Sequence, residues 1–91
     1  MEKLDGRWRV EREAGLLPPF GIGKRIGGGS GWTTLGGVPV GAFRVEGNAL
    51  VYRGWPIRDE LRWQADGTWS GRGLLGGREF CRFRLVPAER P

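Results

Sequence analysis

The sequence predicts an all-β fold, a small antiparallel up-and-down β-barrel of about eight short strands. Three glycine-containing dipeptides, Gly47-Asn48, Asp66-Gly67 and Gly76-Gly77, each lie between runs of alternating apolar and polar residues, a pattern typical of β-hairpins with two-residue turns. The 18 Gly are accompanied by 5 Trp, 4 Phe and 1 Tyr, an aromatic content that argues against disorder. With 91 residues, the chain is expected to form one domain over residues 1–91.

Each expected strand follows from its local pattern. The first begins at Trp8, where alternation places Trp8 and Val10 on one face and charged residues on the other. Residues 15–21 contain two adjacent prolines, which cannot donate to a sheet, so this segment is expected to be an apolar loop. Two weaker strands are expected at 23–26 and 32–35, around a glycine-rich tip. Sharper alternation predicts five further strands, at 42–46, 49–53, 61–65, 68–75 and 78–86.

Two-residue turns fix the register of the strands, so the residues that face the interior can be predicted. Across Gly47-Asn48, Phe43 is expected opposite Tyr52, and Val45 opposite Leu50. All four of these side chains then line the core.

Across the other two turns, Trp63 is expected opposite Ser70, and Arg72 beside Cys81. This register places Arg72 on the core face, where an arginine is seldom found without a partner. One interpretation is that Arg72 holds a carboxylate ligand. Two alternatives are that Arg72 lies near a barrel mouth and reaches solvent, or that a bulge at a neighbouring glycine turns it to the other face.

The opposite face of the same strands is expected to expose Trp69 among arginines. Stacked Arg and Trp side chains stabilise one another by about 1 kcal/mol, and this purely structural interpretation is favoured. The functional interpretations are a contact in a homodimer, which is the better of the two, or a grip on single-stranded nucleic acid. The predicted interaction surface consists of Arg62, Trp69, Arg82 and Arg84.

Composition excludes several classes of function. The chain has no histidine, the commonest general base and metal ligand, and a single cysteine, Cys81. No zinc-ligand spacing and no Ser-His or Cys-His pair can therefore be assembled. We expect a non-enzymatic protein without catalytic residues, metal or cofactor. Its net charge of +5 rests mostly on arginine, which suits anionic partners.

The sequence also predicts where the protein acts. No run of about 18 apolar residues could span a bilayer, and residues 1–5 lack the apolar segment of a signal peptide. We therefore expect a cytoplasmic protein without a membrane partner.

The Gly6-Arg7-Trp8 triplet on the first strand, the apolar loop after it and the closing segment at 80–85 together resemble a much-shortened member of the calycin superfamily, which comprises the lipocalins and the fatty-acid-binding proteins. The lipocalin resemblance implies an up-and-down barrel in which Trp8 packs across the closed end, with Arg82 or Arg84 lying over it. Fatty-acid-binding proteins hold a carboxylate with interior arginines and a tyrosine.

The first functional hypothesis is that the barrel binds a small apolar or anionic ligand in its interior. The candidate ligand-binding residues are Tyr52, Trp63, Ser70, Arg72 and Arg12. The alternative is a basic interaction module that uses the outer Arg/Trp face for a homodimer partner or nucleic acid. A third possibility is a barrel filled by its own side chains that serves only in assembly, because eight strands enclose little more than side-chain space.

Overall fold

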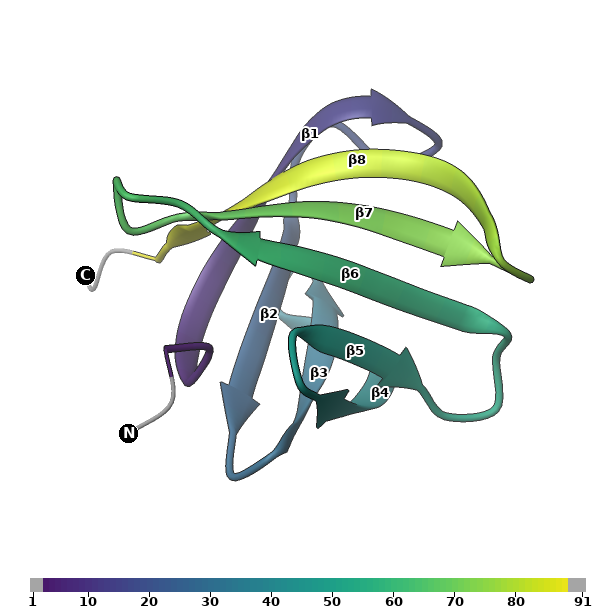
Figure 1. Cartoon of the computed structure of the whole chain (residues 1–91), viewed down its shortest axis with the longest axis horizontal. Helices are drawn as coiled ribbons and strands as arrows, with labels where there is room; N and C mark the ends of the chain where they lie inside the picture. The colour runs from purple at the N-terminus through teal and green to yellow at the C-terminus, as the bar shows by residue number, and fades with distance from the viewer. Residues whose placement is uncertain (1–2, 89–91) are drawn as a thin grey trace.

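The computed structural model describes residues 3–88, and these form eight antiparallel strands that close into a barrel in chain order (Figure 1). The strands are β1 (Gly6–Gly15), β2 (Ile22–Gly27), β3 (Ser30–Leu35), β4 (Val38–Glu46), β5 (Ala49–Tyr52), β6 (Ile57–Trp63), β7 (Trp69–Leu75) and β8 (Arg78–Pro87). The predicted up-and-down barrel is therefore confirmed. It closes within one chain, through the pairing of β1 with β8. The expectation of one domain also covers residues 1–2 and 89–91, which lie outside the described part.

The β4–β5 hairpin has the register that the sequence predicts. Phe43 pairs with Tyr52, and Val45 with Leu50, across the Gly47-Asn48 turn. Phe43 and Leu50 are fully enclosed, with 1% and 0% of their surface exposed. A glycine at the first turn position allows the positive φ of 59° that this tight connection requires.

The predicted register across Asp66-Gly67 is wrong by one residue. The connection is five residues long rather than two, and Trp63 pairs with Trp69. The Gln64 amide donates to the Thr68 carbonyl over 2.9 Å, while Asp66 Oδ1 accepts from both the amide and the hydroxyl of Thr68, at 3.1 and 2.6 Å. This side-chain turn, typical of aspartate, extends the loop beyond the predicted dipeptide.

A second one-residue shift follows the Gly76-Gly77 turn. The turn itself is as predicted, because Leu75 pairs with Arg78. A β-bulge then leaves Phe80 as an extra residue, so that Gly73 pairs with Cys81. Each shift is by one residue, so β7 changes face relative to both β6 and β8. The face of β7 that was expected to be outside therefore lies inside, while β6 and β8 keep the faces that the sequence predicts.

The reversed face of β7 corrects two predictions. Trp69 lies inside, 3% exposed, whereas Arg72 lies outside with half of its side chain exposed. A one-residue slip moves every side chain of a strand to the opposite face. The next two inward positions after Trp69 are Gly71 and Gly73, which face large neighbours: a Cβ at Gly71 would lie 2.5 Å from the Phe83 ring.

The core is one cluster of buried side chains from all strands except β3. Its members are Leu4, Trp8, Val10, Ile26, Phe43, Leu50, Leu61, Trp69, Cys81, Phe83 and Leu85. Near the start of β1, the Trp8 indole donates to the Leu4 carbonyl over 2.8 Å. The two arginines that the lipocalin resemblance places over Trp8 instead pair with carboxylates on the outer face, at Glu79 and Asp66. Among residues 3–88, no helix is long and apolar enough to cross a membrane.

Candidate functional site

The barrel interior contains four polar side chains that bind one another: Lys24, Thr33, Tyr52 and Asp59. The Lys24 ammonium lies 2.7 Å from Thr33 Oγ1 and 2.6 Å from Tyr52 Oη. It also lies 3.1 Å from Asp59 Oδ2, to which the Tyr52 hydroxyl donates over 2.9 Å. The side chains of Lys24 and Asp59 are only 5% and 6% exposed, so this is a buried ion pair. We call these four residues the interior cluster.

Aromatic rings enclose the charged end of Lys24. Its ammonium lies 5.6 Å from the ring centre of Phe43, 5.3 Å from that of Tyr52 and 5.7 Å from that of Phe83. Such rings attract a cation that has lost its water. The three N–H donors of the ammonium each have an acceptor within the interior cluster. The hydrogen-bonding capacity of Lys24 is therefore used by the protein itself.

The environment sets the protonation of this cluster. Burial disfavours the charged form of Lys24, but attraction to Asp59 and the hydrogen bonds outweigh burial, so the pKa of Lys24 is raised above its ordinary value. Burial is the main cause that raises the pKa of the Tyr52 phenol, against the attraction of Lys24. Burial likewise raises the pKa of the nearby Cys81 thiol. At neutral pH the interior therefore holds an ammonium, a neutral phenol and a neutral thiol.

These three raised pKa values predict that the protein loses stability in alkali. Each group binds its proton more tightly in the folded state, so its contribution is fully present below its unfolded pKa and is lost as pH rises through its folded pKa. We expect the free energy of unfolding to fall above about pH 9 to 10, the range in which unfolded Cys, Tyr and Lys titrate. Urea denaturation from neutral pH upward measures this. Tyr52→Phe should show a shallower fall, and a wild-type curve that rises with pH would contradict the account.

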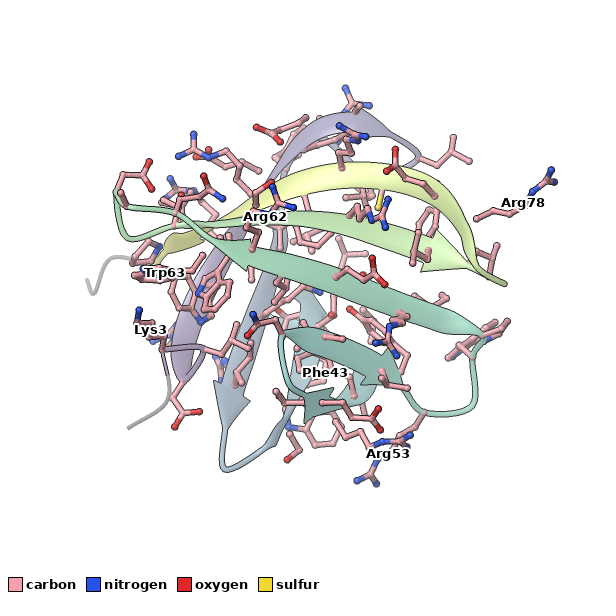
Figure 2. The ribbon with its side chains drawn as sticks, in the orientation of Figure 1. Lys3, Phe43, Arg53, Arg62, Trp63 and Arg78 are labelled. Carbon is pink, nitrogen blue, oxygen red and sulfur yellow. The ribbon has the colours of Figure 1, made fainter. Side chains whose placement is uncertain are left out.

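The structure brings only one predicted ligand-binding residue into the interior, Tyr52. Trp63 lies at the edge of the barrel, 37% exposed, where its ring meets that of Trp69 at 5.0 Å and Lys3 lies over it at 4.9 Å (Figure 2). Arg12 is exposed and donates weakly to the Gly15 carbonyl. The remaining two, Ser70 and Arg72, lie on the outer face of β7.

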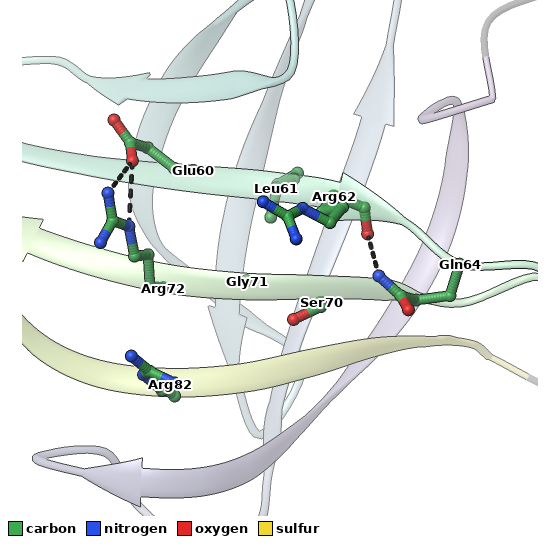
Figure 3. Close-up of a pocket in the computed structure, with 8 residues that line it drawn as sticks. All are labelled: Glu60, Leu61, Arg62, Gln64, Ser70, Gly71, Arg72 and Arg82. Atoms are coloured by element: carbon green, nitrogen blue, oxygen red, sulfur yellow. Dashed lines mark hydrogen bonds and ion pairs between the residues drawn. The ribbon is translucent and has the colours of Figure 1, made fainter.

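Arg72 has a partner on that outer face rather than a ligand inside. It donates two hydrogen bonds to Glu60 Oε1, at 3.0 and 2.8 Å (Figure 3). The interior-arginine interpretation is therefore wrong. The bulge alternative is correct in part, because the β7–β8 register shifts between Gly73 and Leu74.

Sequence reasoning did not find the interior ion pair. Lys24 lies two residues before Ile26, and Asp59 lies two residues before Leu61. Each charged residue therefore lies on the same face of its strand as a core residue. This shared face was the only available signal. A lysine and an aspartate on separate strands indicate an interior pair only when the register of the whole barrel is known.

Two of the three arginines of the predicted interaction surface, Arg62 and Arg82, line one outer hollow, but its aromatic residue does not lie with them. Arg62, Arg72 and Arg82 surround a hollow of about 610 Å³ on the outer face of β6, β7 and β8 (Figure 3). Glutamates pair with two of these arginines: Glu60 with Arg72, and Glu79 with Arg82 at 3.0 Å. Trp69, expected on this face, points into the core. Arg84, also expected here, pairs with an aspartate of the β6–β7 loop.

An exposed aromatic residue does accompany arginines on the other side of the barrel. Arg7 pairs with Arg25, and Arg25 with Trp32, so these residues form one row across the outer face of β1, β2 and β3. Trp32 is 51% exposed. Two hollows of about 410 and 440 Å³ both contact Arg7 and Arg25, and Trp32 lines the second. We call these three residues the Arg/Trp row.

The charge of this row is not compensated within the described chain. Between residues 3 and 88, no aspartate or glutamate forms an ion pair with Arg7 or Arg25, whereas the next arginine along β1, Arg9, binds Glu11 at 2.9 Å. The row therefore offers two available guanidinium groups beside an indole. The sequence did not predict it because the turn between the two weak strands, which sets Arg25 opposite Trp32, has no distinctive turn residue besides glycine.

The chain is thus defined as a closed eight-stranded up-and-down barrel with a buried ion pair in its interior and cationic outer hollows. Comparison with protein-family models, with curated proteins and with solved structures finds no match to this sequence.

Proposed function

We propose that this chain is a non-enzymatic, cytoplasmic binding module of calycin-like architecture that holds single-stranded nucleic acid against the Arg/Trp row. The observation that supports the proposal is the register row Arg7, Arg25, Trp32, in which two guanidinium groups that pair with no carboxylate of residues 3–88 adjoin an exposed indole. Arginine binds phosphate through paired hydrogen bonds. Every base has a face that can stack on tryptophan, so such a surface binds strands with little sequence preference.

The interior cluster argues against the first hypothesis, a ligand inside the barrel. A ligand at Tyr52 would have to displace Lys24 or Asp59, which already bind that hydroxyl. Breaking such a buried pair leaves an uncompensated charge and is strongly unfavourable. An outer surface needs no such rearrangement.

A homodimer through the Arg/Trp row is also less well supported. A two-fold contact brings the same patch of both copies together. The guanidinium groups of Arg7 and Arg25 would then face like charges without a carboxylate between them. An anionic polymer supplies the opposite charge instead.

Fluorescence anisotropy with a labelled oligothymidine of about 12 nucleotides tests the proposal. Trp32→Ala should weaken binding about tenfold, because one stacked base contributes about 1–3 kcal/mol. Arg7→Glu/Arg25→Glu should weaken binding further and make it less sensitive to salt between about 50 and 200 mM. The matched control is Arg62→Glu/Arg82→Glu, which removes the same charge from the β6–β8 face and should change affinity less than about threefold. Equal losses in the two double variants would show binding by net charge alone and overturn the proposal.

A further inference from the structure

One end of the barrel exposes most of the large apolar side chains that solvent reaches. Within residues 3–88, nine such side chains are exposed, and all but Trp32 and Trp63 lie in or beside the connections that follow β1, β3, β5 and β7. We call these seven residues the apolar rim: Leu16, Phe20, Leu35, Val38, Val40, Trp55 and Leu75. Exposed apolar groups gathered in this way mark an interaction site.

Topology places the rim at one end of the barrel, and hydrogen bonds join its four connections in two pairs. In an up-and-down barrel the connections alternate between the two ends, so those after odd-numbered strands share an end. The Gly36 amide donates to the Gly21 carbonyl and the Gly76 amide to the Pro56 carbonyl, both over 2.8 Å. The first bond links the β1–β2 loop to the β3–β4 turn, and the second links the β5–β6 loop to the β7–β8 turn. In Figure 1 the ends of β1, β5 and β7 point away from the two termini.

Arginines accompany the rim. Arg12 lies near the end of β1, Arg53 follows β5 and Arg78 begins β8, and the last two reach away from the barrel (Figure 2). In the part of the chain that the structure describes, no carboxylate forms an ion pair with any of the three. The same end of the barrel therefore combines apolar side chains on separate loops with available positive charge.

We propose that the apolar rim docks this protein on the surface of an anionic lipid bilayer. Apolar side chains, tryptophan above all, enter the boundary between head groups and acyl chains, while arginines bind the phosphates. A second copy of the chain fits less well, because Arg53 and Arg78 would meet the same charges across the interface. Docking of this kind needs no membrane-spanning segment, but it departs from the expectation, drawn from the sequence, of a protein without a membrane partner. It uses another surface than the Arg/Trp row and does not rest on the proposed function.

Co-sedimentation with vesicles tests this inference. The wild-type protein should bind vesicles of phosphatidylcholine with about 30% phosphatidylglycerol and should bind pure phosphatidylcholine at least tenfold less. Phe20→Ser/Trp55→Ser, the rim variant, should bind the anionic vesicles at least tenfold less, because it removes two aromatic side chains that would enter the bilayer surface. Both side chains are exposed, so the fold should tolerate their loss. Trp32→Ser removes an exposed aromatic side chain that does not belong to the rim, on the outer face of β3, and should bind as wild type.

Two further measurements separate this inference from its rivals. Arg7→Glu/Arg25→Glu should keep most vesicle binding. The rim variant, Phe20→Ser/Trp55→Ser, should keep its affinity for oligothymidine, so either proposal can fail alone. Sedimentation velocity without lipid should show the same species for wild type and for the rim variant. Absent vesicle binding, vesicle binding that survives loss of Phe20 and Trp55, or a wild-type dimer that the rim variant abolishes would each overturn the membrane proposal.

Discussion

Lys24→Met is expected to lower the free energy of unfolding by about 3–5 kcal/mol, the cost of leaving one member of a buried ion pair without its partner. The side chain of Asp59 is 6% exposed, so its carboxylate would remain inside with only the Tyr52 hydroxyl as donor. Small domains have about 5–15 kcal/mol of stability in total. Urea denaturation at neutral pH, followed by tryptophan fluorescence, should therefore show a transition at much lower urea concentration.

The double variant Lys24→Met/Asp59→Leu is the control for this prediction. Replacing both members of a buried pair by apolar residues is often neutral or stabilising, so this variant should recover most of the lost stability. A single variant that loses less than about 1 kcal/mol would show that solvent reaches the pair, contrary to the buried interior described here.

Gly31→Ala is expected to have the second largest effect, a loss of about 3 kcal/mol, at the upper end of what overpacking produces. A Cβ at Gly31 would collide with the carbonyl oxygen of Arg25 and lie 2.9 Å from the Phe43 ring. The carbonyl belongs to the paired strand β2 and Phe43 is 1% exposed, so neither can move aside without disturbing the sheet or the core. Thermal or urea unfolding measures the loss.

Gly27→Ala provides a matched control four residues earlier. No atom lies within 4 Å of the position of its Cβ, and its φ is not in the left-handed region. The alanine should therefore be neutral or stabilise the protein by up to about 1 kcal/mol, through the smaller entropy of the unfolded chain. If the two alanines had equal effects, the close approach at Gly31 would not be real.

Local patterns predicted the fold and one hairpin fully. The Gly47-Asn48 turn fixed the pairing of Phe43 with Tyr52 because the turn is tight and the strand before it alternates from Phe43 to Glu46. The two errors in the predicted register both concern the pairing of β7 with its neighbours. An aspartate side chain lengthens the turn before β7, and a bulge at Phe80 of β8 follows the turn after it. Neither device changes the alternation of the sequence. The longer turn and the bulge each change only which residue of the neighbouring strand lies opposite a given residue of β7. This was enough to place Trp69 inside and Arg72 outside, the reverse of the prediction.

The candidate sites depend on contacts between distant strands, which alternation does not reveal. Tyr52 was predicted to face inward, but its partner Lys24 lies 28 residues earlier in the chain. The Arg/Trp row likewise needs the registers of β1, β2 and β3 together. The exposure of Trp32 could be predicted only after its strand was placed. The curvature and closure of the barrel, rather than any motif, bring the interior cluster together, whereas the Arg/Trp row follows from the two hairpin registers of β1, β2 and β3.

We propose that this barrel binds its partner outside, at the Arg/Trp row, and not in its interior. The most direct test is an NMR titration of ¹⁵N-labelled protein with oligothymidine, followed through the indole N–H signals of its 5 Trp. We expect the Trp32 signal to shift strongly and the signals of the buried Trp8 and Trp69 to remain in place. Shifts at Trp69 with Trp32 unchanged would place the ligand in the interior and contradict the account.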